Sequence, residues 1–112
     1  MGRQFIEYLD VDRVYACRKC KLHLTSSTEL MSKNFWGATG KAFLFNRVIN
    51  MTTGEAEERM MRTGLHSVRD LICKGCGQIL GWKYDWASES DQKYKEGKCI
   101  LEKSYICKVE WN

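Results

Sequence analysis

The chain has 112 residues, a formal net charge of +4, six cysteines and no proline. This length suits one domain with a modest hydrophobic core, so we expect residues 1–112 to form a single domain. No apolar run approaches the roughly 18 residues of a membrane-spanning helix, and the mild charge does not by itself indicate nucleic-acid binding.

The N-terminal half is predicted to be mostly extended. Residues 3–16 indicate a first strand and turn. A polar segment then predicts a single helical turn at 29–32. After a turn at 37–40, residues 41–51 give the clearest strand, and apolar side chains on both of its faces are typical of a central strand.

The C-terminal half is also predicted to be mostly β. Residues 52–62 contain good helix formers, but we favour a hairpin with residues 65–72, because an extended chain brings the following segment back economically. Residues 87–97 predict a loop with one turn of helix, and 98–110 predict a final strand. Residues 79–86 alternate, with one face made of Leu80, Trp82, Tyr84 and Trp86. The whole pattern predicts two antiparallel sheets with little helix.

Two Cys-x-x-Cys pairs are the strongest chemical signal in the chain. The first pair is Cys17 and Cys20, the second is Cys73 and Cys76, and 52 residues lie between the pairs. Two intervening residues let a tight turn aim both sulfurs at one ion, and four thiolates suit tetrahedral zinc. Because four cysteines close the coordination sphere, we predict one structural zinc and no catalytic metal.

Disulfide bonds are the alternative for a short chain with six cysteines. The first twelve residues carry acidic side chains and lack the apolar segment of a signal peptide, so we expect an intracellular protein, whose thiols stay reduced. His23 could replace one cysteine ligand, but we expect a surface or packing role for it. Cys99 and Cys107 share one face of the final predicted strand, where we expect them to pack as free thiols.

These residues resemble the Yippee family over about residues 15–102. The 52-residue gap between the two cysteine pairs is also the spacing of that family, whereas Asp91 departs from the serine usual at its position. Besides the cysteine pairs, the matching stretches are Gly37-Ala38-Thr39-Gly40-Lys41-Ala42-Phe43-Leu44-Phe45-Asn46, Val48, Asn50, Glu58-Arg59, Thr63-Gly64-Leu65-His66, Leu80-Gly81-Trp82-Lys83-Tyr84 and Gln92-Lys93-Tyr94-Lys95-Glu96-Gly97.

The resemblance implies a zinc-pinned β-tent, in which two antiparallel sheets meet at the metal. This fold is similar to the thalidomide-binding domain of cereblon, a ubiquitin-ligase substrate receptor. Trp82 matches one wall of the aromatic cage of that domain and Tyr84 matches a following aromatic residue, while residues 65–71 offer no counterpart for the other two tryptophans. The resemblance further implies protein partners, including a ubiquitin-ligase complex, a role in cell growth or division, and a place in the nucleus or cytoplasm.

We predict a non-enzymatic binding module with its ligand or partner site on the aromatic face of residues 79–86. Trp82 would carry the site, with Tyr84 beside it and His66 as a polar rim. Such aromatic faces attract cationic groups over their rings. The alternative is that both aromatic residues belong wholly to the core.

Two other classes of function stay open. A nucleic-acid-binding stripe could form from four lysines and one ring, namely Lys93, Lys95, Lys98, Lys103 and Tyr94, although interleaved glutamates weaken it. A redox enzyme similar to the B-type methionine sulfoxide reductases would use Cys107 as its nucleophile. The surrounding Tyr105-Ile106-Cys107-Lys108-Val109 lacks the arginine and asparagine of those enzymes, so we predict no catalysis.

Overall fold

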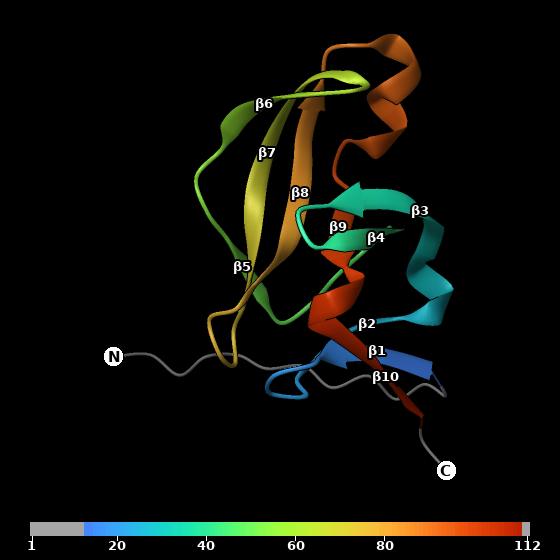
Figure 1. Ribbon diagram of the computed structural model, residues 1–112, viewed down its shortest axis with the longest axis vertical. Coiled ribbons are helices and arrows are strands. Elements are labelled where there is room, and N and C mark those ends of the chain that lie inside the picture. The colour runs from blue at the N-terminus through green and yellow to red at the C-terminus, as the bar shows by residue number, and fades with distance from the viewer. Residues whose placement is uncertain (1–12, 111–112) are drawn as a thin grey trace.

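A computed structural model describes residues 13–110, arranged as two antiparallel sheets (Figure 1). The first ten residues of the strand predicted at 3–16 lie outside the described residues. The smaller sheet has the order β10-β1-β2 and lies at the bottom of Figure 1. Its strands are β1 (Arg13–Cys17), β2 (His23–Ser26) and β10 (Ile106–Glu110).

The larger sheet has seven strands in the order β3-β4-β9-β8-β7-β5, and β6 pairs with the other half of β7. These strands are β3 (Leu30–Gly37), β4 (Gly40–Phe45), β5 (Met51–Thr53), β6 (Glu57–Met61), β7 (Gly64–Cys73), β8 (Ile79–Ala87) and β9 (Cys99–Glu102). Helix is limited to three short 3-10 turns, η1 (Ser27–Glu29), η2 (Ser90–Lys95) and η3 (Lys103–Tyr105). The prediction of two antiparallel sheets with little helix is therefore confirmed.

None of the helical segments in the described part of the chain has the length and apolar character needed to cross a membrane.

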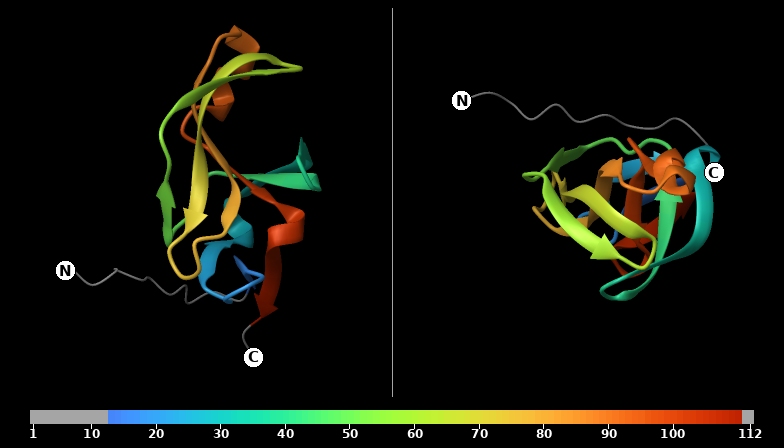
Figure 2. Two further views of the ribbon diagram at one scale, coloured as in Figure 1. Left: turned by 60° about the vertical axis from the view of Figure 1, so that its left-hand side comes forward. Right: turned by 90° about the horizontal axis from the view of Figure 1, so that it is seen from above.

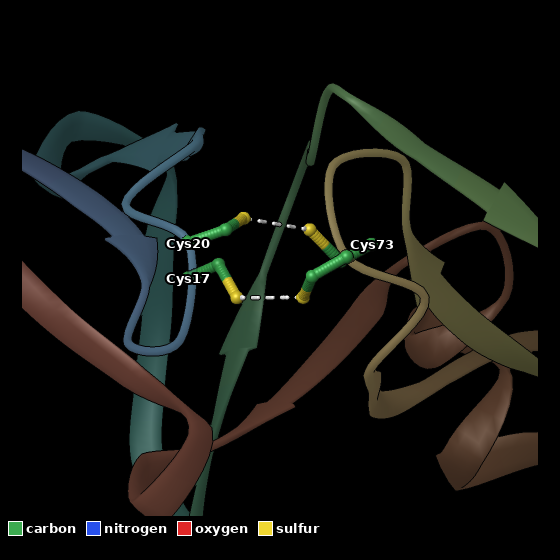
Figure 3. Close-up of side chains that lie close together, drawn as sticks. Cys17, Cys20 and Cys73 are labelled. Atoms are coloured by element: carbon green, nitrogen blue, oxygen red, sulfur yellow. Dashed lines mark hydrogen bonds between the residues drawn. The ribbon is translucent and has the colours of Figure 1, made fainter.

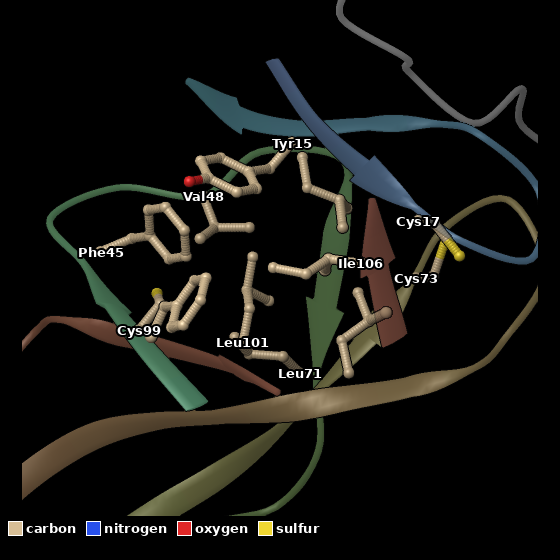
Figure 4. Packing of buried hydrophobic residues seen from close by; sticks show 12 residues of the cluster. Tyr15, Cys17, Phe45, Val48, Leu71, Cys73, Cys99, Leu101 and Ile106 are labelled. Carbon is tan, nitrogen blue, oxygen red and sulfur yellow. The ribbon is translucent and has the colours of Figure 1, made fainter. Parts of the chain in front are cut away.

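The main core lies where the two sheets meet (Figure 4). Tyr15 of β1 packs edge-on against Phe45 of β4, with ring centroids 5.2 Å apart. Ile106 of β10, Leu101 of β9 and Leu71 of β7 belong to the same cluster. Cys17 and Cys73 lie at its edge in Figure 4, so the metal-binding turns adjoin the main core.

A second cluster covers the opposite face of the larger sheet. In β4, Phe43 and Phe45 belong to the main core, whereas Ala42 and Leu44 belong to this second cluster, as alternation along a strand requires. Its members are Ala42, Leu44, Val68, Trp82, Tyr84 and Ile100, with Phe35 and Met61 against them. The larger sheet curves strongly around this face (Figure 2).

The strand predicted at 41–51 is wrong in its second half, because β4 ends at Phe45. The chain then leaves the sheet and turns into β5 after Asn50, whose φ of 56° is left-handed. The buried Asn50 side chain donates a hydrogen bond from Nδ2 to the His23 carbonyl, 2.7 Å away. This bond ties the connection to β2 and satisfies the buried amide.

The strand predicted at 98–110 is also two strands, separated by η3. Cys99 therefore lies in the larger sheet and Cys107 in the smaller sheet, so they do not share a face. Cys99 is buried in the core, whereas Ile106 takes the inward position in β10 and leaves Cys107 half-buried. The shared face predicted for Cys99 and Cys107 is therefore wrong, whereas both are free thiols as predicted.

The predictions for residues 52–62 and 29–32 differ in how well they agree with the structure. The hairpin favoured for residues 52–62 is confirmed, since β6 pairs with β7. The helical turn expected at 29–32 occurs slightly earlier, as η1, and strand β3 follows it without having been predicted.

Strand β8 does not present one continuous aromatic face. Its pairing with β7 skips one residue at Leu80 and another at Asp85, as in β-bulges. Leu80 consequently faces the main core, whereas Trp82 and Tyr84 face the second cluster. Trp86 lies beyond the second bulge and is exposed, so the predicted four-residue face holds only for its two central members.

Candidate metal centre and aromatic groove

The four predicted metal ligands come together, and Figure 3 shows Cys17 and Cys20 pointing toward Cys73 from the opposite turn. Their sulfur atoms all lie within 4.8 Å of one another, with Cys17 3.6 Å from Cys76 and Cys20 3.5 Å from Cys73. A tetrahedron with Zn–S bonds of about 2.3 Å would separate its sulfurs by about 3.8 Å, and a disulfide would need about 2.05 Å. The spacing therefore fits one zinc ion held by four thiolates.

The two cysteine-bearing turns have the same backbone geometry. The Cys17 N–H donates to the Leu22 carbonyl, and the Lys21 N–H donates back to the Cys17 carbonyl. In the second turn, the Cys73 N–H donates to the Gln78 carbonyl, and the Gly77 N–H donates to the Cys73 carbonyl. Each turn thus closes around its first cysteine and directs two sulfurs to one point.

The residue four positions after the first cysteine is left-handed in both turns, with φ of 66° at Lys21 and 78° at Gly77. Glycine accepts this conformation freely, whereas lysine pays about 1 kcal/mol for it. The first turn keeps the conformation without a glycine, so zinc binding and its two backbone hydrogen bonds must compensate.

The protonation of these thiols is uneven in the metal-free chain. Burial raises the pKa of Cys73 to about 12, and burial also raises the pKa of Cys17. Burial acts in the same direction on Cys76, but the Gln78 backbone N–H and the neighbouring thiols outweigh it and lower its pKa. Zinc binds thiolates and displaces their protons, so the charge of the dication stabilises the deprotonated form of this cluster.

An aromatic groove of about 910 Å³ opens on the opposite face of the larger sheet, against the second cluster. We use this name for the space lined by β3, the turn after β6, β8 and η2. Its residues are Ser32, Asn34, Phe35, Trp36, Met61, Arg62, Thr63, Trp82, Tyr84, Gln92, Tyr94 and Lys95. Five of the twelve are aromatic, so the walls suit a ligand with an apolar body.

Trp82 and Tyr84 both line this groove, and they also belong to the core. Their rings meet edge to face with centroids 6.2 Å apart, and Trp82 is 9% exposed. Burial raises the pKa of the Tyr84 hydroxyl, and the nearby indole N–H of Trp82 lowers that pKa in part. The two groups do not form a hydrogen bond. The sequence posed a choice between an exposed aromatic face and the core, but each residue both belongs to the core and lines the groove.

His66 does not form the polar rim that the sequence suggested. Its side chain is 0% exposed and is not among the groove-lining residues. The imidazole Nδ1 lies 2.9 Å from the Gly64 carbonyl, and the ring packs against Tyr84 at 5.3 Å between centroids. His66 lies between β6 and β8 on β7, where it is buried and packs against Tyr84.

Sequence reasoning missed the other aromatic walls. Phe35 and Trp36 come from β3, which was not predicted, and Tyr94 comes from η2. Trp36 is 70% exposed and lines the groove. The available signal was the pair Phe35-Trp36 directly before the glycine-rich turn at 37–40.

The fold and the four-thiolate centre define a small β domain held together by one structural zinc. A family model described as Yippee zinc-binding/DNA-binding/Mis18, centromere assembly, matches residues 13–112. The chain is 49% identical over 110 residues to Protein yippee of Drosophila melanogaster, a match that covers 98% of this chain and 91% of the relative. The chain belongs to the Yippee-Mis18 family.

Two further comparisons agree. A yippee-like protein of Arabidopsis thaliana is 52% identical over 102 residues, covering 91% of this chain and 84% of the relative. The crystal structure of the Mis18 'Yippee-like' domain superposes with a TM-score of 0.71 at 12% identity, covering 91% of this chain and 99% of that one. At such low identity the likeness concerns the fold alone.

Proposed function

We propose that the protein is a non-enzymatic binding module that takes a small ligand or a peptide end in the aromatic groove. The observation that carries this proposal is the convergence of rings from three separate elements, β3, β8 and η2, on one concave space. Apolar pockets with a few polar groups are the usual form of a ligand site. The zinc centre adjoins the main core at the turn between β7 and β8, so it fixes the start of β8, which carries Trp82.

The polar groups of the groove suggest the chemistry of the ligand. Among the described residues that line the groove, the Trp82 indole N–H and the Gln92 Oε1 are buried without a hydrogen-bond partner. An unsatisfied buried group costs about 1–3 kcal/mol, which a ligand could recover by pairing with it after a small side-chain rotation. We therefore expect a ligand that offers both an acceptor and a donor, as an amide does.

Lys95 argues against a cationic ligand, which the aromatic face alone had suggested. Its side chain is 3% exposed, and its Nζ lies 5.3 Å from the Phe35 ring and 5.4 Å from the Tyr84 ring. Nζ also donates to Thr63 Oγ1, 3.1 Å away. Burial lowers the pKa of Lys95, and the Asp91 charge opposes that shift. The chain thus supplies its own cation to these rings, and a second cation would be repelled.

We place this module among protein partners in the regulation of growth or division, in the nucleus or cytoplasm, with a ubiquitin-ligase complex as one setting. The support is family membership together with a groove of the right size for a peptide end. Centromere assembly is part of the description of the family model, and a partner involved in division agrees with it.

The test is a fragment screen by NMR on the zinc-loaded protein, read at the indole N–H signals. Four tryptophans give four such signals, and Trp36 and Trp82 line the groove while Trp86 does not. We expect amide-bearing fragments to shift the signals of Trp36 and Trp82 and not that of Trp86. Trp36→Ala should abolish binding, whereas the exposed control Trp86→Ala should retain it. Fragments that bind without shifting the Trp36 and Trp82 signals would contradict the proposal.

Nucleic-acid binding is the second candidate, since the family description includes DNA binding. The predicted lysine stripe gives it no support. Lys95 is buried, Lys93 pairs with Glu96 at 3.1 Å, and Lys103 lies in η3 rather than in η2 with the other two. Filter binding of DNA at low and high salt would detect such an activity.

A further inference from the structure

A second, smaller groove of about 400 Å³ lies where β1 and β10 of the smaller sheet meet β3, β4 and η3. Five positively charged side chains line it: Arg18 from the turn after β1, Lys33 from β3, Lys41 from β4, Lys103 from η3 and Lys108 from β10. The other lining residues among those that the structure describes are Tyr15, Phe43, Ile106 and Cys107, so none of the described lining residues is acidic. We call this space the basic groove.

The five positive charges of this groove exceed the net charge of the whole protein. The whole chain has a formal charge of +4, and four thiolates with one Zn²⁺ add −2, which leaves about +2. Within residues 13–110, the salt bridges are formed by Arg59, Arg69 and Lys93, and none involves a cation of the basic groove. Like charges gathered in one concavity repel each other and raise the local concentration of anions.

Three of these cations are already held in place. The Arg18 guanidinium donates from Nε to the Ser104 carbonyl and from Nη2 to the Ile106 carbonyl, at 3.1 and 2.8 Å. Lys33 Nζ lies 5.6 Å from the centre of the Phe43 ring, and Lys108 Nζ lies 5.8 Å from the centre of the Tyr15 ring. Because these side chains have lost part of their freedom, an anion that binds them pays less ordering entropy.

The shape of the groove selects among anions. Tyr15 and Phe43 are buried, so their ring faces are covered and cannot stack nucleobases, as single-stranded nucleic acid would need. A duplex is read by protein elements that protrude into its grooves, whereas this surface is concave. In the described sheets β10 and β3 are edge strands, and Lys108 and Lys33 belong to them. A concave site beside edge strands suits an extended peptide.

We propose that the basic groove is a second binding site of the protein, for an acidic peptide segment of a partner rich in Asp and Glu. The site is separate from the aromatic groove, with which it shares no lining residue. The five cations bind the carboxylates, and their positions on both sheets make the site depend on the zinc-held arrangement of those sheets.

Fluorescence anisotropy with a labelled hexaglutamate peptide tests this proposal on the zinc-loaded full chain. We compare the wild type with Lys41→Gln/Lys103→Gln, which removes two exposed groove charges. The matched control, Arg47→Gln/Lys98→Gln, removes the same charge outside the groove. Zinc content and melting temperature are measured for all three proteins.

We expect binding at 50 mM salt that weakens at 200 mM, a loss of at least tenfold in the groove variant, and little change in the control. Equal losses in both variants would show an effect of net charge alone and overturn the proposal. Absence of peptide binding by the wild type would also overturn it. Tighter binding of labelled single-stranded DNA, lost in the groove variant, would replace the peptide with nucleic acid.

Discussion

Gly75 lies directly against Cys20: a Cβ added at Gly75 would sit 2.8 Å from the Cys20 sulfur. The second cysteine-bearing turn therefore has no room for a side chain, because the first turn delivers a ligand to that place. The contact joins the two sheets through residues that are 55 positions apart in the sequence.

We predict that Gly75→Ala lowers zinc affinity at least tenfold, since the new methyl group displaces the Cys20 sulfur. Competition with a chromophoric zinc chelator measures this. Gly77→Ala is the control, because a Cβ there meets nothing within 4 Å and adds only the strain of a positive φ, about 1 kcal/mol. Equal affinities for wild type and Gly75→Ala would show that the contact is unimportant.

Gly81→Ala should destabilise the protein more than an ordinary surface change. A Cβ at Gly81 would lie 2.8 Å from the Ile100 carbonyl carbon, and this backbone atom of β9 cannot move without parting two central strands. We expect a loss of about 1–3 kcal/mol or more in urea unfolding. Gly54→Ala, where the nearest atom lies at 3.8 Å, should change stability by less than about 1 kcal/mol.

Trp82→Ala should lower the free energy of unfolding by about 3–5 kcal/mol, because the indole is almost completely buried. Trp36→Ala should cost less than about 1 kcal/mol, because that ring is mostly exposed. Urea unfolding of both variants measures the difference. A small loss of stability in Trp82→Ala would mean that this residue belongs to the groove alone. A large loss of stability in Trp36→Ala would mean that this variant cannot be used to test ligand binding separately from folding.

The two cysteines outside the metal centre should differ in reactivity. Burial raises the pKa of Cys99 to about 11, so at pH 8 only about one thiol in a thousand is the reactive thiolate. Cys107 is half-buried at the basic groove, and Lys21 Nζ lies 3.6 Å from its sulfur. We expect a maleimide to label one cysteine of the zinc-loaded protein at pH 8, and none in Cys107→Ser.

The raised pKa of Cys99 also makes the stability of the fold depend on pH. The fold favours the neutral Cys99 thiol, so its stabilising contribution is complete below the ordinary pKa of 9.0 and is lost as pH rises towards about 11. Labelling of Cys99 at pH 8 without unfolding would contradict the burial on which both expectations rest.

The sequence predicted the metal ligands well because each Cys-x-x-Cys pair is local and its spacing alone directs two sulfurs to one ion. It predicted the sheets but not their breaks. The end of β4 depends on the bond between Asn50 and the His23 carbonyl, and the bulge at Leu80 depends on pairing with β7. Periodicity along one strand contains neither contact.

The binding groove was harder to predict for the same reason. Trp82 lies on a strand with clear alternation, but its partners Trp36 and Tyr94 reach it from segments 46 and 12 residues away in the sequence. His66 was placed at the rim because it begins a strand near the second cysteine pair. The cross-strand register, which the sequence does not show, pairs His66 with Ala87 of β8, and its side chain is buried there.

The central claim is that one zinc ion, held by Cys17, Cys20, Cys73 and Cys76, joins the two sheets and supplies part of the folding free energy. Thermal unfolding followed by circular dichroism, with zinc counted by mass spectrometry before and after chelation, tests it most directly. We predict one zinc per chain, and loss of the cooperative transition when the metal is removed or when Cys73 is replaced by serine. A metal-free protein that melts at the same temperature as the zinc-loaded protein would contradict the account.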